Sequence, residues 1–195
     1  MKTKALSALA VLLVSKVASF AAFDLGSSAG STPYDPYMRG VKQVLSSLPS
    51  SKANLERAAQ LTRTAHSFRY SYTEPYVAQA PSVTAAKKTG DCKAKSLWLA
   101  DQLGDRSIRY VIGKATRTSK MSHAWLMWND GSKWWVLDPT NVSRPIQAER
   151  TSRNEYIPLY SYDSARSYRH AGLSSGIAGV ANKGGAVASK AAKRR

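Results

Sequence analysis

Cysteine is almost missing from this sequence: of 195 residues, only Cys92 is one. A chain with a single cysteine forms no intramolecular disulfide, and it lacks the paired cysteines that hold structural zinc. The thiol of Cys92 is therefore a structural side chain, a link to another chain, or a reactive group. The residues around it decide among these three.

Acidic residues are also scarce, with 12 Asp and Glu against 29 Lys and Arg, and the formal net charge is +17. Such an excess favours contact with anionic polymers, whether nucleic acid, acidic wall polymers or an anionic membrane surface. The basic residues are scattered along the chain, and no zinc-finger spacing or RNA-recognition signature is present. We therefore predict non-specific contact with anionic polymers and no specific nucleic-acid partner.

Long apolar runs are missing beyond the first segment, "MKTKALSALAVLLVSKVASFA". This segment has two early lysines, a short apolar run and small residues with cleavage positions after Ser19 or Ala21, which is the layout of a secretory signal. We expect residues 1–21 to be a signal peptide, no membrane span to remain after its removal, and the protein to be secreted or periplasmic. The sequence indicates no oligomeric state.

Composition divides the remaining chain into three parts. Residues 22–36 are rich in Gly, Ser and Pro and are predicted to form a flexible lead-in. Residues 37–168 have the apolar and aromatic content of one folded domain. Residues 169–195 consist mainly of Gly, Ala and Ser with a basic end, and we expect a disordered tail there.

Periodicity before the cysteine predicts two helices and a strand. Apolar residues at helical spacing predict a helix from Met38 to Leu48 and a second one around residues 55–62. "SFRYSY" alternates as a half-buried strand does, with the aromatic side chains inward. The stretch around Pro75 and Pro81 is predicted to be a loop.

Cys92 lies where a helix is expected to begin. Asp91 is a favourable N-cap residue, the apolar stripe of Ala94, Leu97 and Trp98 follows, and Gly104 marks the expected end. Backbone N–H groups and the positive end of the helix dipole stabilise a thiolate in the first turn. After the helix, "SIRYVIG" is predicted to be a strand.

Two aromatic-rich runs, "MSHAWLMW" and "KWWVLDP", are separated by "NDGS", which predicts a β-hairpin. Strand alternation places His123 and Trp125 on one face. With a two-residue turn at Asp130 and Gly131, or a four-residue loop from Asn129 to Ser132, His123 lies directly opposite Asp138, with Cβ atoms ~4.5–5.5 Å apart. A three-residue loop without a bulge would move Asp138 to the other face.

A thiol at a helix start, a strand histidine and an aspartate across from it together indicate cysteine-based acyl transfer. That chemistry needs a nucleophile, a base, and a group that orients the base. Each residue also has a structural interpretation: a buried thiol at Cys92, a packed core histidine at His123 and a turn residue at Asp138. All three interpretations would have to hold together, so we favour the reactive one.

"TGDCKAKSLWLADQLG", "SHAWLMW" and "WWVLDPT", in this order and spacing, resemble the three signature blocks of the transglutaminase-like superfamily, of the bacterial transglutaminase-like cysteine peptidase type. "FRYSYTEP" is similar to the strand and loop that precede the cysteine block there. The resemblance covers about residues 55–140. It implies an α+β fold with a papain-like core, in which the cysteine-bearing helix packs on an antiparallel sheet.

The resemblance also implies catalytic roles. Cys92 would be the nucleophile, His123 the general base and later acid, and Asp138 the residue that orients His123. Members of this kind form a thioester from an amide or peptide carbonyl, which water resolves in peptidases and amidases and a primary amine resolves in transamidases. The implied substrates are extracytoplasmic proteins or wall peptides. No organic cofactor is implied, and the sequence has no acidic cluster for the calcium that some large animal members require.

Several alternatives stay open. The chain could instead be a non-catalytic transglutaminase-like module that binds peptides or anionic cell-surface polymers, or an adhesin for polyanions. Papain-like wall hydrolases more often take their third residue from soon after the histidine strand, so "LDPT" favours the transglutaminase-like assignment. Beside the backbone N–H of Cys92, a second oxyanion donor could come from Gln79, Tyr72 or Trp125. "NVS" at Asn141 matches an N-glycosylation sequon.

Overall fold

A computed structural model describes residues 24–74, 76–152 and 154–173 of the chain. The helices are α1 (Arg39–Ser47), α2 (Leu55–Ser67), α3 (Pro81–Lys87) and α4 (Cys92–Leu103), with 3₁₀ turns η1 (Asp35–Tyr37), η2 (Ala148–Arg150) and η3 (Ala171–Leu173). The strands are β1 (Ser27–Ala29), β2 (Arg69–Tyr70), β3 (Thr89–Gly90), β4 (Ile108–Thr116), β5 (His123–Asn129), β6 (Trp134–Leu137), β7 (Ile146–Gln147), β8 (Glu155–Tyr162) and β9 (Ser167–Arg169).

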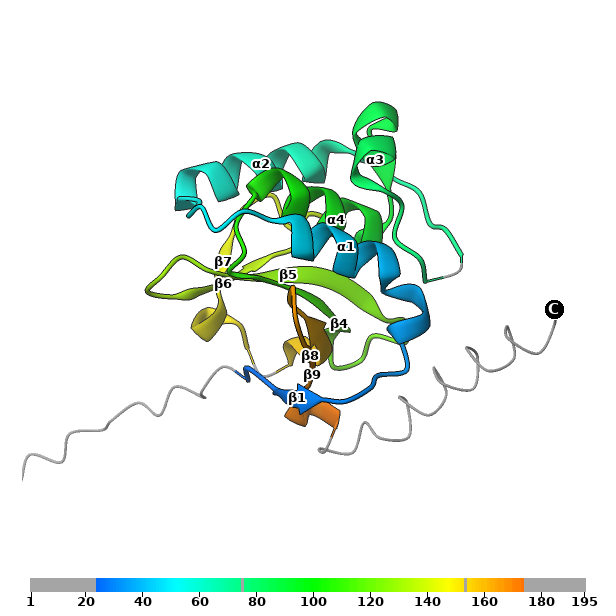
Figure 1. Ribbon diagram of the computed structural model, residues 1–195, viewed down its shortest axis with the longest axis vertical. Coiled ribbons are helices and arrows are strands. Elements are labelled where there is room, and N and C mark those ends of the chain that lie inside the picture. The colour runs from blue at the N-terminus through cyan, green and yellow to red at the C-terminus, as the bar shows by residue number, and fades with distance from the viewer. Residues whose placement is uncertain (1–23, 75, 153, 174–195) are drawn as a thin grey trace, which may run out of the picture.

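Seven of the strands form one antiparallel sheet in the order β1-β9-β8-β4-β5-β6-β7, and β2 pairs with β3 in parallel. The four helices gather on one side of the large sheet (Figure 1). The cysteine-bearing helix α4 contacts β5 and β4 of this sheet. The α+β fold with this helix on an antiparallel sheet was predicted from the resemblance, and the structure confirms it.

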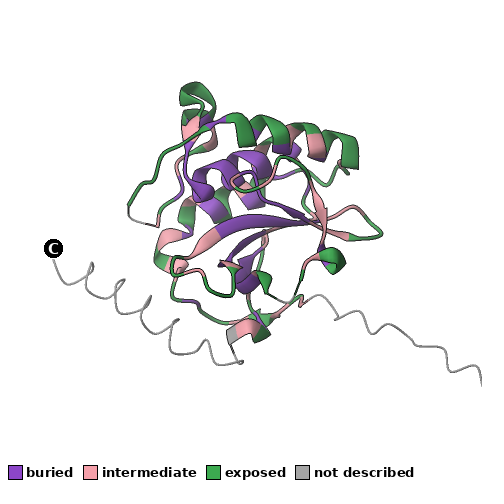
Figure 2. Ribbon diagram, turned by 180° about the vertical axis from the view of Figure 1, so that it is seen from behind, coloured by how far each residue is buried: buried purple, intermediate pink, exposed green. Residues whose placement is uncertain are grey.

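Helix α4 is the central helix, because it contacts α1, α2 and α3 as well as strands β4 and β5 of the sheet. It is buried from Cys92 to Ala100, with Lys93 and Lys95 among the buried residues, and only Asp101 and Gln102 near its end are more exposed (Figure 2). The helix begins at Cys92 and ends before Gly104, whose left-handed backbone (φ of 62°) terminates it as a glycine C-cap does. Both ends were predicted correctly from the sequence.

The β5–β6 hairpin forms, but its register differs from the prediction by two residues. The loop spans residues 130–133 and Asn129 pairs with Trp134, so Val136 lies opposite Met127. The predicted register, in which His123 lies directly opposite Asp138, is therefore wrong. The carboxylate of Asp130 sets this loop by accepting hydrogen bonds from Ser132 N and Lys133 N, both at 2.8 Å. Because strand side chains alternate with period two, a shift of two residues keeps His123 and Asp138 on the same face.

The expected flexible lead-in and the domain limits need correction. Residues 27–29 form strand β1, which pairs with β9, and Asp24 bonds to the backbone N–H of Ala171 at 2.6 Å. The folded part therefore extends at least from residue 24 to residue 173, beyond the predicted limits of 37 and 168. The predicted signal peptide, 1–21, and most of the predicted tail lie outside the described residues.

Two local predictions before the cysteine are wrong in part. The expected loop does extend over residues 71–74 and 76–80, which have no helix or strand. Pro81 starts helix α3 at its first helical position, where proline fits, instead of marking a loop. Residues 68–72 contribute only the two-residue strand β2. Phe68 is buried as expected, but Tyr70 and Tyr72 are 50% and 49% exposed rather than inward. Across the described residues, the structure contains no helix with the length and apolar character that a membrane crossing requires.

Candidate active site

Cys92 is the first residue of α4, directly after the short strand β3, and it is 9% exposed. The N-cap residue Asp91 accepts a hydrogen bond from Ala94 N at 3.1 Å. Gly90 makes the sharp entry possible, because a Cβ there would lie 2.7 Å from the Cβ of Ala94. The "GDC" sequence thus places the sulfur at the helix start, where backbone N–H groups stabilise negative charge.

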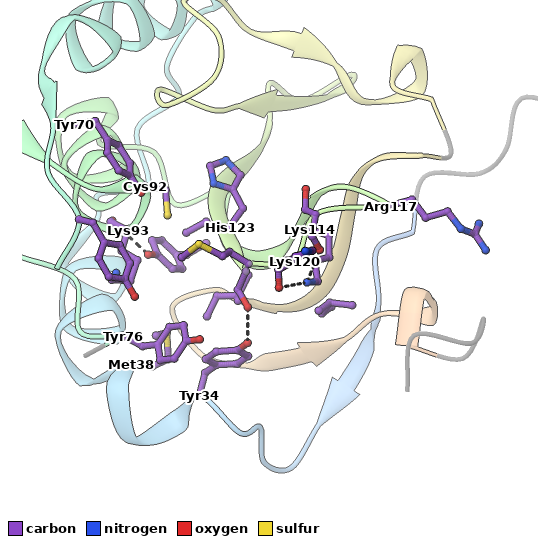
Figure 3. Close-up of a pocket in the computed structure, with 18 of the residues that line it drawn as sticks. Tyr34, Met38, Tyr70, Tyr76, Cys92, Lys93, Lys114, Arg117, Lys120 and His123 are labelled. Atoms are coloured by element: carbon purple, nitrogen blue, oxygen red, sulfur yellow. Dashed lines mark hydrogen bonds between the residues drawn. The ribbon is translucent and has the colours of Figure 1, made fainter. Parts of the chain in front are cut away.

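His123 is the first residue of β5, and its ring stacks on that of Trp125 with centroids 5.9 Å apart. Its Nε2 bonds to Asp138 Oδ2 at 2.8 Å, which leaves Nδ1 as the nitrogen available to the thiol. Figure 3 shows the side chains of His123 and Cys92 next to each other in a cavity, and Cys92 is one of the groups that raise the pKa of His123. The structure thus brings together the three residues that the sequence singled out.

The charge state of His123 follows from its neighbours. Burial by itself lowers the pKa of His123, but the hydrogen bond to Asp138, the adjacent thiol of Cys92 and the charges of these two groups outweigh burial and raise the pKa from 6.5 to about 9. The imidazole is therefore protonated at neutral pH. This form stabilises a neighbouring thiolate, so the site can hold a thiolate–imidazolium pair.

Asp138 is fully buried just after β6, yet its carboxylate is well supplied with donors. They are His123 Nε2, the side-chain amide of Asn141, the hydroxyl of Tyr156, and the backbone N–H groups of Thr140 and Asn141. Burial raises the pKa of Asp138, but the bond and charge of His123 and the other donors outweigh this and lower it. Asp138 is therefore an anion held in place beside the imidazole.

Sequence reasoning missed Asn141 and Tyr156. The amide Nδ2 of Asn141 lies 2.8 Å from Asp138 Oδ2 and 3.2 Å from His123 Nε2, so this residue contacts both. Its position three residues after Asp138, beyond a proline turn, was a usable signal. Tyr156 donates to Asp138 Oδ2 at 3.2 Å from β8, a strand that the sequence analysis did not assign.

Lys93 follows Cys92, but its ammonium group is occupied by other partners. It pairs with Asp91 Oδ2 and donates to the carbonyl of Thr73 at 3.1 Å. Thr73 also donates to Asp91 through its hydroxyl, at 2.9 Å. Asp91 therefore caps the helix with one oxygen and neutralises Lys93 with the other.

The three candidates for a second oxyanion donor differ in whether the donor group already has a hydrogen-bond partner. Gln79 donates to Thr84 Oγ1 at 3.0 Å, and the hydroxyl of Tyr72 donates to Glu74 at 2.9 Å. The indole Nε1 of Trp125 is buried and, among the described residues, has no hydrogen-bond partner. Gln79 thus has a structural role, while Tyr72 lies at the cavity that Cys92 lines.

Cys92 and His123 line a cavity of about 640 Å³. Tyr34, Tyr70, Tyr72 and Tyr76 also line it, as do residues 117–122 of the loop between β4 and β5. The thiol is therefore accessible from a space large enough for several peptide residues. In the described part of the chain, no three His, Cys, Asp or Glu side chains come together in a way that could hold a metal ion.

Comparison with solved structures identifies the fold. Calcium-bound LapG of Legionella pneumophila aligns at a TM-score of 0.50 and 14% identity, over 70% of this chain and 77% of LapG. EGTA-treated LapG aligns at a TM-score of 0.50 and 16% identity, over 73% and 78% of the two chains. The fold is transglutaminase-like. No protein-family model and no curated protein sequence matches the chain.

At these identities the likeness to LapG concerns the transglutaminase-like fold alone. In that fold the present chain has Cys92 at the start of α4 and His123 at the start of β5. Asp138 follows β6 directly. The chemistry therefore has to be argued from the side chains of this protein.

Proposed function

We propose that this protein is an exported thiol enzyme with a peptidase or amidase activity, in which Cys92, His123 and Asp138 are the catalytic residues. The observation that carries this proposal is the row of thiol, imidazole and buried carboxylate, in which the thiol lies next to the imidazole and the imidazole bonds to the carboxylate. Likeness to LapG, a cysteine protease with the same fold, supports a peptidase-like function. The protonated state of His123 at neutral pH supports a reactive thiolate.

In the proposed reaction, the thiolate of Cys92 attacks the carbonyl carbon of a peptide or amide bond. The helix-start N–H groups stabilise the oxyanion that forms. As the C–N bond breaks, the imidazolium of His123 donates its proton to the leaving amine, and a thioester with Cys92 remains. Asp138 keeps Nε2 of the ring engaged throughout, so that Nδ1 stays directed at the reacting groups.

Deacylation uses the same residues in the opposite direction. Neutral His123 accepts a proton from water, which attacks the thioester carbonyl, and the C–S bond breaks to release the acid and regenerate the thiolate. A primary amine in place of water gives a transferred amide instead, so transamidation needs no additional residue. The signal-like first segment supports extracytoplasmic proteins or wall peptides as substrates.

Mass spectrometry of the purified protein with a peptide library and a small primary amine tests this function. Peptide cleavage, side-chain deamidation and amine incorporation give different mass changes. The wild-type protein should produce at least one of them, while Cys92→Ala and Cys92→Ser lose it by roughly 10³-fold or more with an unchanged circular dichroism spectrum. Full turnover by Cys92→Ala would refute the proposal.

A further inference from the structure

The cavity beside Cys92 has two chemically different sides. On one side lie the tyrosines Tyr70, Tyr72 and Tyr76, of which Tyr70 and Tyr72 are half exposed. Tyr34 extends this side: its ring packs edge-on against Tyr76 at 5.5 Å, and its hydroxyl bonds to Ser122 at 3.2 Å. Such a surface binds apolar or aromatic side chains.

The other side is basic. Lys114, Arg117 and Lys120 line the cavity there, and Figure 3 shows them on the side of His123 away from Tyr70, with Arg117 extending outward. In Figure 3, Cys92 and His123 thus lie between Tyr70 and the basic residues. A peptide whose reacting bond lies at Cys92 would therefore contact both sides, one on each side of that bond.

The basic side belongs to an ordered loop. The ammonium group of Lys114 is buried and donates to the carbonyls of Ser119 and Lys120, at 2.7 and 2.9 Å. Arg117 N donates to Asn154 O at 2.8 Å, which ties the loop to the chain before β8. Because Lys114 and the backbone hold the loop, the side chains of Arg117 and Lys120 are left at its exposed surface.

The positive charge of this side is not neutralised within the molecule. No acidic residue lines the cavity, and Lys93, at its tyrosine side, already pairs with Asp91. Among the described residues, which include all Asp and Glu of the chain, no carboxylate lies within ion-pair distance of Arg117 or Lys120. An anionic group of a ligand would therefore be the first to pair with them.

We propose that this cavity selects peptides with an Asp or Glu on one side of the reacting bond and an aromatic or large apolar residue on the other. Arg117 and Lys120 pair with the acidic side chain, and the tyrosines contact the apolar one. That a bond reacts at Cys92 rests on the proposed function, whereas the selection itself is a binding property of the cavity. Charge complementarity of this kind also speeds encounter with acidic peptides.

Calorimetric binding to the Cys92→Ala protein tests the selection without turnover. The probes are the hexapeptide acetyl-Ser-Tyr-Ser-Gly-Glu-Ser-amide, the version with Tyr and Glu exchanged, and both peptides with Gln in place of Glu. In at least one order, the Glu peptide should bind about tenfold more tightly than its Gln partner. The preference should shrink as salt is raised from low to physiological concentration.

Two pairs of substitutions locate the effect. Adding Arg117→Ala and Lys120→Ala to the Cys92→Ala protein should remove the preference for Glu over Gln. Adding Lys87→Ala and Lys133→Ala, which removes the same charge from exposed positions outside the cavity, should preserve most of it. The proposal is overturned if Glu and Gln peptides bind with equal affinity in both orders, or if neither Glu peptide binds at about 1 mM. It is also overturned if the preference for Glu survives the Arg117→Ala and Lys120→Ala substitutions.

Incubating the same peptides with the wild-type protein separates this proposal from the proposed function. Preferential binding of Glu peptides without any Cys92-dependent turnover would contradict the enzymatic proposal and leave the selection supported. Cys92-dependent turnover of Glu and Gln peptides with equal kcat/KM would contradict the selection and leave the enzymatic proposal supported.

Discussion

At the scale of single residues, the site depends on how a buried carboxylate is kept charged. Asp138 is fully buried, and a buried anion is stable only when donors surround it. Asn141 and Tyr156 supply two of these donors from outside the residues that the sequence singled out. Asn141 Nδ2 lies 3.2 Å from Nε2 of His123 and donates to the carboxylate that holds the ring, so Asn141 acts on the ring through Asp138.

Replacing Tyr156 with Phe removes the hydroxyl bonded to Asp138 and keeps the ring that packs against Trp125. We expect the free energy of unfolding to fall by about 1–2 kcal/mol in urea titrations, since a bond to a charged group is lost. We also expect kcat/KM to fall about tenfold. Tyr168→Phe, which removes a hydroxyl bonded to Asp163 away from the site, should leave kcat/KM unchanged. Unchanged kcat/KM in Tyr156→Phe would contradict the positioning of Asp138 by this hydroxyl.

The pH profile of turnover should report His123. Its pKa is raised to about 9, so the imidazolium that protonates the leaving amine is present below that pH and is lost above it. We therefore expect kcat/KM for peptide cleavage to fall as pH rises through about 9. In Asp138→Asn the charge and bond that raise the pKa are weakened, and the fall should move to lower pH. A fall at the same pH in both proteins would exclude His123 as its source.

At the scale of elements, two structures bring the site together: the start of α4 and the β5–β6 hairpin. The start of α4 was predictable, because an N-cap aspartate, an apolar stripe and a terminal glycine are all local signals. The shared face of His123 and Asp138 was predictable from strand alternation. The register was not, because hydrogen bonds from the loop backbone to Asp130 accompany a loop at residues 130–133, one residue later than the four-residue loop considered from the sequence.

The surroundings of the site were less predictable, since they depend on contacts between distant segments. Tyr70 and Tyr72 alternate as core residues of a strand would, yet they lie half exposed at the cavity because β2 pairs with β3 for only two residues. Strands β7 and β9 have only two and three residues, so their sequences alone do not indicate that they pair in the large sheet. No local sequence signal predicted that Tyr156 would reach Asp138 from β8.

Asp91 provides an element-scale test because it caps α4 and pairs with buried Lys93. Asp91→Ala should lower the free energy of unfolding by about 3–5 kcal/mol, because it leaves a buried ammonium group without its partner. Adding Lys93→Ala should recover part of this loss. Urea unfolding followed by tryptophan fluorescence measures all three proteins. A loss below about 1 kcal/mol in Asp91→Ala would show that the pair is unimportant for the helix start.

At the scale of the whole molecule, the first described segment provides one edge strand of the large sheet. Strand β1 pairs with β9, and Asp24 bonds to the backbone of Ala171 and, through its carbonyl, to His170 Nδ1 at 3.1 Å. The segment predicted to be a flexible lead-in is therefore part of the fold. It covers β9, which would otherwise be an exposed edge strand.

Removing this segment should affect stability more than activity. A chain that starts at Ser31 should melt about 5 °C below one that starts at Asp24, because the β1–β9 pairing and the contacts of Asp24 are lost. Its kcat/KM should stay within about twofold, since α4, β5 and β6 hold the site. Thermal unfolding and turnover of the two purified chains test this. Equal melting temperatures would refute the structural role of β1.

The rate of Cys92 alkylation by iodoacetamide, measured against pH, tests the thiolate–imidazolium pair most directly. Because the imidazole of His123 lies next to the thiol, Cys92 should react faster in the wild-type protein than in His123→Ala, by roughly 100-fold in acidic and neutral solution. Equal rates for the two proteins across the acidic range would contradict the account.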